Sequence, residues 1–333
     1  MTTIRLGVVG LGRFAALHLA CIRAMPDVTV AAVCDLNAEA ANEAAERFHC
    51  PGFTDWKRML AEADLDAVDV LTPESTHFEI ATAALDSGCH VFVEKPLALR
   101  AEEGKLMARK ALEQGKLLMV GHVCRFDVRY VRTKQAIVEG SLGRLRSIYA
   151  RRNNGKQFFS LYRRANPIYV LGIHDIDLLR WFADSEVEEV FAYRTENQDG
   201  DCDLVWSMLK FENGVIGVIE NNWLLPEKAP AFMDTCMEVV GKKGTVQLRE
   251  PDQSLVFWDT RGTVSSPLVS GYENYGRTVG PLHEELHHFF RCVAEGRPSD
   301  ILKAEDAVKA VEVAEAILQS CERGTPVRLH PAG

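Results

Sequence analysis

The sequence lacks three features that would each place it in a specialised class of protein. Its nine cysteines are odd in number and include no C-x-x-C pair, which argues against a disulfide framework or a thiolate zinc site. Acidic residues outnumber basic ones by 47 to 38, and this net charge of −9 argues against a nucleic-acid-binding surface. No apolar run approaches the roughly 20 residues of a membrane-spanning helix. We therefore expect reduced thiols, no metal site, and no nucleic-acid or membrane partner.

The composition that is present is that of an ordinary globular enzyme. The chain has 333 residues, of which 47% are hydrophobic and 26% charged. At roughly 150 residues per domain, this length favours two domains. Residues 1–6 run into a strand pattern and leave no room for a signal peptide, so we expect a cytoplasmic protein.

The first part of the chain alternates short β-branched runs with helical stretches, the pattern of a parallel sheet built from βαβ units. Strands are predicted at residues 6–9, 28–34, 67–71, 90–93 and 117–120. Helices are predicted between them at residues 14–25, 38–48, 76–87 and 101–114. We therefore expect an α/β fold in which residues 1–121 form a doubly wound parallel sheet.

After Gly121 the pattern changes to strands with few helices between them. Strands are predicted at residues 144–152, 187–195, 203–211, 215–223, 235–240 and 245–249. Two amphipathic helices, 282–292 and 304–321, and a short strand from Pro326 follow. Residues 122–333 are therefore predicted to be an α+β domain with an open, mostly antiparallel sheet, whose apolar face suggests self-association.

A G-x-G-x-x-A element lies where the first strand turns into a helix. Gly10 permits the tight turn, and Gly12 lets the backbone approach a pyrophosphate at the helix N-terminus. Asp35 follows Ala15 by 20 residues, where its carboxylate would accept hydrogen bonds from the ribose hydroxyls. This carboxylate would repel a 2′-phosphate, so the pattern favours NAD, although Arg13 leaves NADP possible. The alternative is that Gly10 and Gly12 only form a turn and that Asp35 only caps a helix, with no ligand bound.

Two more segments follow predicted parallel strands, at the sheet edge where open α/β folds bind ligands. They are Thr72-Pro73 with His77, and Glu94-Lys95-Pro96. Lys95 is the first catalytic candidate, and a solvated loop lysine is the alternative.

Together these residues resemble the glucose-fructose oxidoreductase/inositol dehydrogenase/MocA-like (Gfo/Idh/MocA) oxidoreductases over nearly the whole chain. Further motifs that carry the resemblance are Gly121-His122, Arg125-Phe126, Gly140–Gly143 and His174–Asp177. The resemblance implies a Rossmann domain and a C-terminal sheet that supplies the substrate wall and commonly the oligomer interface. It also implies a cis peptide before Pro96, which would hold Lys95 toward the nicotinamide. A homodimer or homotetramer is expected.

From the motifs and the resemblance we expect one set of residues at the cofactor and another at the substrate. The cofactor set is Gly10, Gly12, Arg13, Phe14, Asp35, Thr72, Pro73, His77, Glu94, Lys95 and Pro96. The substrate set is Lys95, His122, Arg125, Arg152, Tyr169 and His174. Six arginines follow the Rossmann half: Arg125, Arg129, Arg151, Arg152, Arg163 and Arg164. One or two of them could bind an acidic or phosphorylated sugar. The alternative is that they form a solvated strand face.

The second catalytic candidate is His174, in a segment where Asn166 and Pro167 favour a helix start. Ile173 and Ile176 belong to an inward face, and His174 projects from a neighbouring face. A satisfied core histidine is the alternative. Gly172 is costly inside a helix, and something that approaches the backbone there would explain it.

Inositol-dehydrogenase-like members carry an Asp four residues before this histidine, and this chain has Val170 there. We predict that Asp177, at i+3, fixes the tautomer of His174 instead. Asp175 points about 100° away on the helix and is expected to be a surface or inter-domain contact. The replacement of this Asp by Val170 argues against an inositol-type substrate more than it argues against a dehydrogenase reaction.

The predicted function is hydride transfer between NAD and a secondary alcohol of a sugar, cyclic polyol or sugar derivative. His174 would remove the hydroxyl proton, and Lys95 would stabilise charge on the same oxygen. One alternative is an NADPH-dependent carbonyl or imine reductase in which Lys95 donates the proton. The other is a non-catalytic nucleotide- and sugar-binding regulator, which Val170 favours.

Overall fold

The computed structural model describes residues 3–229, 231, 233–250, 256–259, 262–265, 272–274 and 277–329. They form two compact units, the first from residues 1–127 and 269–309 and the second from residues 128–268 and 310–333. This grouping differs from the predicted boundary after residue 121. The physical reason is that helix α9 (Pro281–Glu295), from late in the chain, packs on α1 (Arg13–Ile22) and into the core of the first unit.

The first unit is built on a six-stranded parallel sheet in the order β3-β2-β1-β4-β5-β6. Its strands are β1 (Ile4–Val9), β2 (Val28–Cys34), β3 (Gly52–Phe53), β4 (Ala67–Val70), β5 (His90–Val93) and β6 (Leu118–Val120). The chain runs outward from β1 in one direction and from β4 in the other, so the switch point lies between these two strands, where such sheets bind ligands. The predicted doubly wound fold is confirmed.

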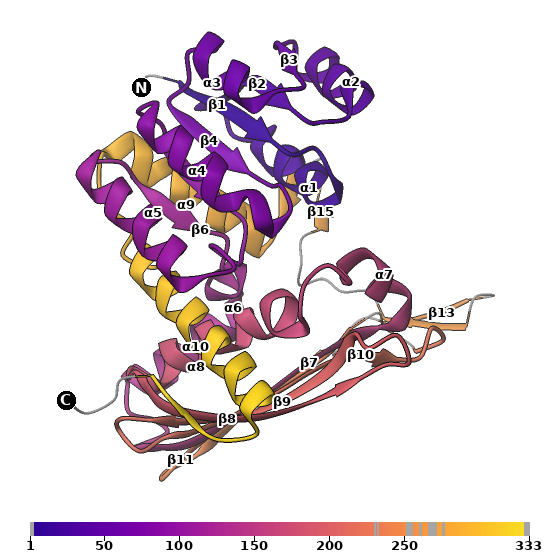
Figure 1. Ribbon diagram of the computed structural model, residues 1–333, viewed down its shortest axis with the longest axis vertical. Coiled ribbons are helices and arrows are strands. Elements are labelled where there is room, and N and C mark those ends of the chain that lie inside the picture. The colour runs from indigo at the N-terminus through magenta and orange to yellow at the C-terminus, as the bar shows by residue number, and fades with distance from the viewer. Residues whose placement is uncertain are drawn as a thin grey trace. The chain divides into compact units, whose positions relative to one another are not determined.

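Helices cover both faces of this sheet: besides α1 and α9 they are α2 (Ala38–Phe48), α3 (Trp56–Glu62), α4 (His77–Asp86) and α5 (Ala101–Glu113). Figure 1 shows α4 and α5 in front of the sheet and α9 behind it. Because both faces are covered, the central strand β4 is buried along its whole length. Asn37 caps α2 by accepting a hydrogen bond from the Glu39 N–H at 3.0 Å, which fixes that helix start as predicted.

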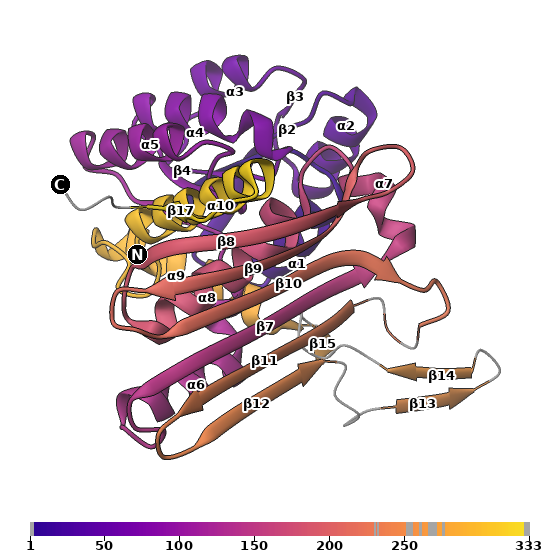
Figure 2. The same cartoon turned by 60° about the horizontal axis from the view of Figure 1, so that its bottom comes forward.

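The second unit is built on a seven-stranded sheet in the order β12-β11-β7-β10-β9-β8-β17. The pairing of β7 with β10 is parallel and the others are antiparallel, which confirms the mostly antiparallel prediction. The strands, side by side in Figure 2, are β7 (Leu145–Gly155), β8 (Val187–Glu196), β9 (Cys202–Phe211), β10 (Ile216–Leu225), β11 (Met233–Gly241), β12 (Thr245–Glu250) and β17 (Val327–Arg328).

Helix α8 (Ile173–Ala183) packs on β7 and β10, and a π-helical turn, η4 (Ile168–Gly172), leads into it. The remaining helices among the described residues are α6 (Val128–Val138), α7 (Phe159–Tyr162), α10 (Ala304–Arg323) and the 3-10 turns η1 (Glu74–Thr76), η2 (Val123–Phe126) and η3 (Lys156–Phe158). Short strands pair as β13 (Val256–Asp259) with β14 (Gly262–Ser265) and as β15 (Tyr272–Asn274) with β16 (Arg277–Val279).

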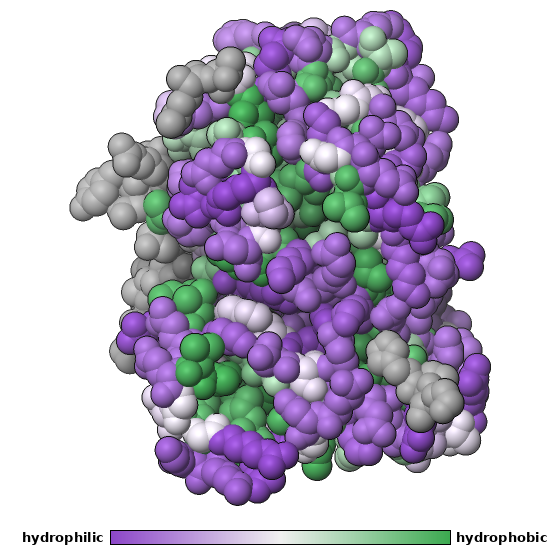
Figure 3. All heavy atoms as spheres, turned by 90° about the vertical axis from the view of Figure 1, so that its left-hand side faces the viewer, coloured by the Kyte–Doolittle hydropathy of each residue, from purple (hydrophilic) through white to green (hydrophobic). Residues whose placement is uncertain are grey.

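The surface is of mixed character. Hydrophilic residues predominate on the face seen in Figure 3, and hydrophobic residues gather there in smaller groups. No helix in the described part of the chain is long and apolar enough to cross a membrane. All nine cysteines are free thiols, five of them buried.

Candidate active site

The glycine-rich turn has the geometry predicted for a phosphate-binding loop. Gly10 adopts φ +94°, and a Cβ there would lie 2.8 Å from the Leu71 carbonyl carbon, so only glycine fits. A Cβ on Gly12 would meet nothing within 4 Å, which leaves open space at the start of α1. The first turn of α1 carries no acidic residue, so its partial positive charge is available for an anion. These features fit the pyrophosphate of a dinucleotide.

Asp35 lies at the end of β2 and is tied to this loop. Its Oδ2 accepts a hydrogen bond from the Leu11 N–H at 2.7 Å, and its Oδ1 accepts one from the Asn37 N–H at 2.8 Å. Each oxygen keeps a lone pair for a ribose hydroxyl. The carboxylate therefore fits the predicted recognition of an unphosphorylated ribose.

His77 joins the loops that follow β4 and β5. Its Nδ1 lies 2.8 Å from the Pro96 carbonyl oxygen, and its Nε2 lies 2.9 Å from the Thr72 carbonyl oxygen. Burial lowers the pKa of His77. The neutral ring donates to only one of the two carbonyls at a time, although it packs between both loops, and its direct contact with a cofactor stays a prediction.

Lys95 follows the carboxyl end of β5. Among residues 91–98 it alone is not buried, which distinguishes it from a packed core position. The Lys95–Pro96 peptide bond is cis, as predicted. The lysine therefore lies at the sheet edge that the prediction required, next to the loop that His77 holds.

A buried charge cluster beneath this segment was missed by sequence reasoning. His18 on α1 has no exposed surface; its Nδ1 lies 2.9 Å from Asp69 Oδ2, and its Nε2 lies 3.3 Å from Glu94 Oε1. Asp69 interrupts the otherwise apolar strand β4 (Ala-Val-Asp-Val), and a charge in a fully buried strand requires a partner. That interruption was the signal available in the sequence.

In the second unit, His174 stands out by exposure. Asn166 begins its segment by accepting a hydrogen bond from the Ile168 N–H at 3.0 Å, as the predicted cap requires. Among residues 167–180, His174 alone is not buried, so the alternative of a core histidine is not favoured. Asp177 is 1% exposed, and its predicted contact with His174 stays a prediction.

The structure corrects the expectation for Asp175, which is neither a surface nor an inter-domain contact. It is 1% exposed, and its Oδ1 accepts hydrogen bonds from Arg152 Nε at 3.1 Å and Nη2 at 2.9 Å. Its Oδ2 accepts one from Asn221 Nδ2 at 3.2 Å. The prediction was wrong because α8 packs on β7 and β10, so the helix face that carries Asp175 is buried.

This arrangement also bears on the predicted substrate residues. Arg152 is 7% exposed and is held by Asp175, which leaves it little surface for a substrate. Arg125 is 4% exposed, donates to the Ile301 carbonyl at 2.8 Å and pairs with Asp306 at 3.2 Å. His122 and Tyr169 are buried too. The contacts of these residues with a substrate stay predictions.

The other four arginines are all engaged. Arg129 pairs with Glu250, Arg151 with Asp234 and Arg163 with Asp201, whereas Arg164 lies over the Tyr162 ring. The binding of a sugar phosphate by any of these four arginines stays a prediction.

Val170 and Gly172 lie in the π-helical turn before His174. Val170 packs in a buried cluster with Leu171 and Trp223, so the position of the carboxylate of inositol-type members is apolar here. A Cβ on Gly172 would overlap the Asn221 side-chain oxygen and the Ile168 side chain. The side chains of Asn221 and Ile168 therefore approach the Gly172 backbone closely, as the glycine suggested.

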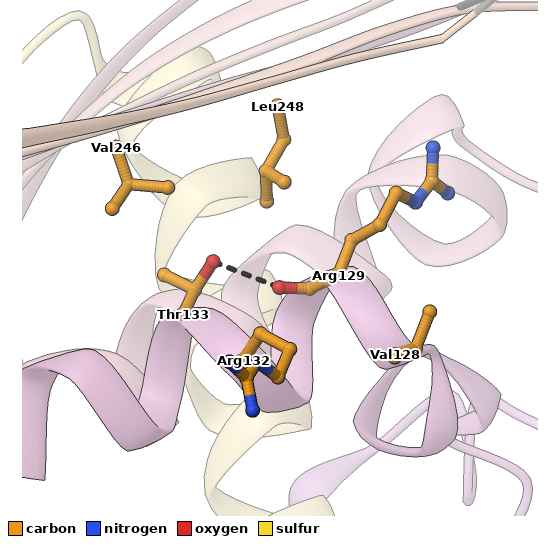
Figure 4. A pocket seen from close by; sticks show the side chains of 6 residues that line it. All are labelled: Val128, Arg129, Arg132, Thr133, Val246 and Leu248. Carbon is orange, nitrogen blue, oxygen red and sulfur yellow. Dashed lines mark hydrogen bonds between the residues drawn. The ribbon is translucent and has the colours of Figure 1, made fainter. Parts of the chain in front are cut away.

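A hollow of about 380 Å³ lies in the second unit between α6 and β12 (Figure 4). It is lined by Val128, Arg129, Arg132, Thr133, Val246 and Leu248. Only Arg129 among these was singled out from the sequence, and none belongs to the predicted catalytic set. The hollow is therefore distinct from the candidate active site.

Comparisons with known proteins agree with this geometry. A model of the oxidoreductase family with an NAD-binding Rossmann fold, GFO_IDH_MocA, matches residues 4–122, and the GFO/IDH/MocA C-terminal domain matches residues 130–247. Among the described residues, no group of three or more His, Cys, Asp or Glu side chains is placed to hold a metal ion.

Similar proteins match along nearly their whole length. A myo-inositol 2-dehydrogenase from Thermotoga maritima is 28% identical over 98% of each chain. An NAD(+)-dependent scyllo-inositol 2-dehydrogenase from Bacillus subtilis is 29% identical over 98% of this chain and 96% of its own. The structure of a scyllo-inositol dehydrogenase from Lactobacillus casei with NAD(H) and scyllo-inositol shares the fold, with a TM-score of 0.85, 21% identity and coverage of 98% and 99% of the two chains.

Proposed function

The chain belongs to the GFO/IDH/MocA family of NAD-dependent oxidoreductases, and from this premise we propose that it oxidises a secondary alcohol of a cyclic polyol, sugar or sugar derivative. The observation that carries the proposal is the position of Lys95. It is the one residue of 91–98 that is not buried, and it follows a strand at the ligand-binding edge of a sheet whose Gly10 and Asp35 fit a dinucleotide. The inositol dehydrogenases among the similar proteins support a polyol substrate.

Each side chain has one task in this mechanism. NAD+, when bound, supplies the acceptor for the hydride from the carbinol carbon. Lys95 donates a hydrogen bond to the hydroxyl oxygen and stabilises its developing negative charge. His174 accepts the hydroxyl proton, and Asp177 fixes its tautomer. Because the position one turn before His174 is the apolar Val170 and not a carboxylate, we include sugars and their derivatives beside inositols as substrates.

The test is a screen for NAD+ reduction, followed at 340 nm, across inositols, aldoses, sugar phosphates and nucleotide sugars. A parallel panel offers ketones, imines and enones with NADH and NADPH. Turnover of an alcohol with NAD+ supports the proposal. Turnover of the carbonyl panel alone with NADPH would establish the reductase, and NAD binding without any turnover would establish the regulator.

Lys95→Met is the decisive variant once a substrate is known. Loss of an oxyanion donor costs about 10²–10³-fold in kcat, and we expect at least this loss with little change in the NAD dissociation constant. Lys105→Met is the matched control, because the Lys105 side chain is 42% exposed and its ammonium pairs with Glu102 on the same helix. Wild-type turnover in Lys95→Met would remove Lys95 from the mechanism.

We also propose a homodimer or homotetramer in the cytoplasm. Exposed apolar side chains support an interface on the sheet face opposite α8: Tyr193 (63% exposed), Trp206 (41%) and Met208 (56%). Tyr193 and Trp206 are direct cross-strand partners, so they share that face. Light scattering should give a multiple of 37.1 kDa that Met208→Lys lowers, and a monomeric wild type would contradict the proposal. The free cysteines are compatible with a reducing compartment.

A further inference from the structure

The buried cluster of His18, Asp69 and Glu94 lies directly behind the lysine that the proposed function uses. Both ring nitrogens of His18 face a carboxylate oxygen, Nδ1 at 2.9 Å from Asp69 and Nε2 at 3.3 Å from Glu94. A neutral imidazole can donate from only one nitrogen, so this geometry favours the imidazolium. The rings of Phe14 and Phe92 pack against it, with centroids 6.2 and 5.7 Å away.

The charges of the cluster depend on one another. Burial works to lower the pKa of His18, but the two carboxylates outweigh it and raise that pKa to about 10. Burial alone would raise the pKa of Glu94, and the hydrogen bond and charge of His18 bring it below its usual value. Burial raises the pKa of Asp69 in spite of His18. His18 is thus the cation that keeps Glu94 ionised.

Glu94 connects this cluster to Lys95. Its Oε2 accepts a hydrogen bond from the Lys95 backbone N–H at 3.1 Å. Its carboxyl group also fills the space beside Gly121 at the end of β6, where a Cβ would lie 2.8 Å from Oε1. The carboxylate is therefore fixed on three sides, by His18, by the Lys95 backbone and by Gly121.

We propose that His18 is a positioning residue for the reaction: through Glu94 it fixes the backbone that carries Lys95, although its own ring never reaches the substrate. The inference rests on the proposed function, in which the Lys95 ammonium contacts the reacting oxygen. His18→Gln removes the ring that holds Glu94 on the α1 side and leaves two buried carboxylates without their cation, so the Glu94 side chain shifts and the hydrogen bond it accepts from the Lys95 N–H is disturbed. A displacement of about 1 Å at a reacting group can cost about 10²-fold in rate.

The kinetic test compares His18→Gln, Glu94→Gln, the double variant and a control. We expect each single variant to lower kcat about 10- to 100-fold, and we expect His18→Gln, whose ring has no exposed surface, to leave the NAD dissociation constant unchanged. The double variant should be no slower than the slower single variant, because both act through one contact. The control is His288→Gln, which removes another buried histidine of the same unit and should keep wild-type kcat. His288 Nε2 is hydrogen-bonded to Ser299 Oγ at 2.8 Å. A folded His18→Gln with wild-type kcat, or additive losses in the double variant, would overturn the proposal.

Two measurements separate this inference from the proposed function. The acetylation rate of Lys95, measured by mass spectrometry relative to Lys105 in the same sample, should change severalfold in His18→Gln whether or not a substrate has been found. Histidine-labelled NMR of the wild type should show an imidazolium signal for His18 at pH 8.5, which needs no folded variant. An unchanged labelling rate or a neutral His18 would refute the positioning role, whereas a wild type without turnover that passes both tests would refute only the proposed function.

Discussion

Removing the charge of Asp175 should destabilise the second unit far more than removing an exposed carboxylate. Asp175 is 1% exposed and accepts two hydrogen bonds from Arg152, which is itself 7% exposed, and a third from Asn221. Asp175→Asn keeps the shape of the side chain and removes the negative charge of Asp175 beside the buried guanidinium. Breaking a buried ion pair by removing one partner costs about 3–5 kcal/mol, so we expect a loss of that order in the free energy of unfolding.

The Arg152–Asp175 ion pair as a whole should contribute much less to the free energy of unfolding than about 3–5 kcal/mol. Burial raises the pKa of Asp175 in spite of Arg152, so desolvation offsets the attraction between the two charges. The double variant Arg152→Met/Asp175→Leu removes both charges and replaces them with apolar groups. We therefore expect it to be more stable than Asp175→Asn.

Urea unfolding followed by tryptophan fluorescence suits this measurement. Four of the five tryptophans belong to residues 128–268, at positions 181, 206, 223 and 258, so the signal reports mainly on the second unit. Asp199→Asn makes the same chemical change at a side chain that is 68% exposed and 3.7 Å from Arg163, where a loss of at most about 0.5 kcal/mol is expected. If the urea midpoints of Asp175→Asn and Asp199→Asn agree, the buried pair does not stabilise the unit as argued.

Three further predictions follow from packing and protonation. Gly172→Ala should cost about 1–3 kcal/mol in urea unfolding, because the added methyl overlaps the Asn221 side chain; a midpoint equal to wild type would contradict the overlap. The pKa of His18 is raised from 6.5 to about 10, so its contribution to stability is fully present below pH 6.5 and is lost as pH rises through 10. Thermal scans should show this alkaline loss in the wild type but not in His18→Gln. Burial raises the pKa of Cys89 to about 11, so about one thiol in a thousand is ionised at pH 8, and its reaction with a disulfide reagent should be slow until urea unfolds the chain.

Much of the fold could be predicted because local signals and burial agree. The strand at 28–34 and the helix at 38–48 were predicted to the residue, since a β-branched run and a helical stretch follow one another directly. The two-residue strand β3 is too short to give a period, and α3 and α6 were missed. The place of α9 depends on packing across most of the chain, which no local pattern encodes.

Candidate site residues could be named from the sequence where they lie in contiguous motifs, as for Gly10, Asp35 and Lys95, and their roles stay predictions. The site was not predictable where two residues far apart in sequence share a buried charge. His18 and Asp69 are 51 positions apart, and Arg152 and Asp175 are 23 apart on different elements. For such pairs the sequence shows only an isolated charge in an apolar segment.

The imidazole of His77 has a consequence for protein engineering. Its ring lies between the carbonyls of Thr72 and Pro96 and donates to one of them, so the crossover loops after β4 and β5 pack on one shared side chain. A foreign loop grafted in place of residues 72–77 to alter dinucleotide preference would shift Lys95, unless the graft keeps His77 and the positions of the Thr72 and Pro96 carbonyls. Libraries that diversify one loop while freezing the other should therefore yield mostly slow enzymes, and co-varying the two loops is the better design.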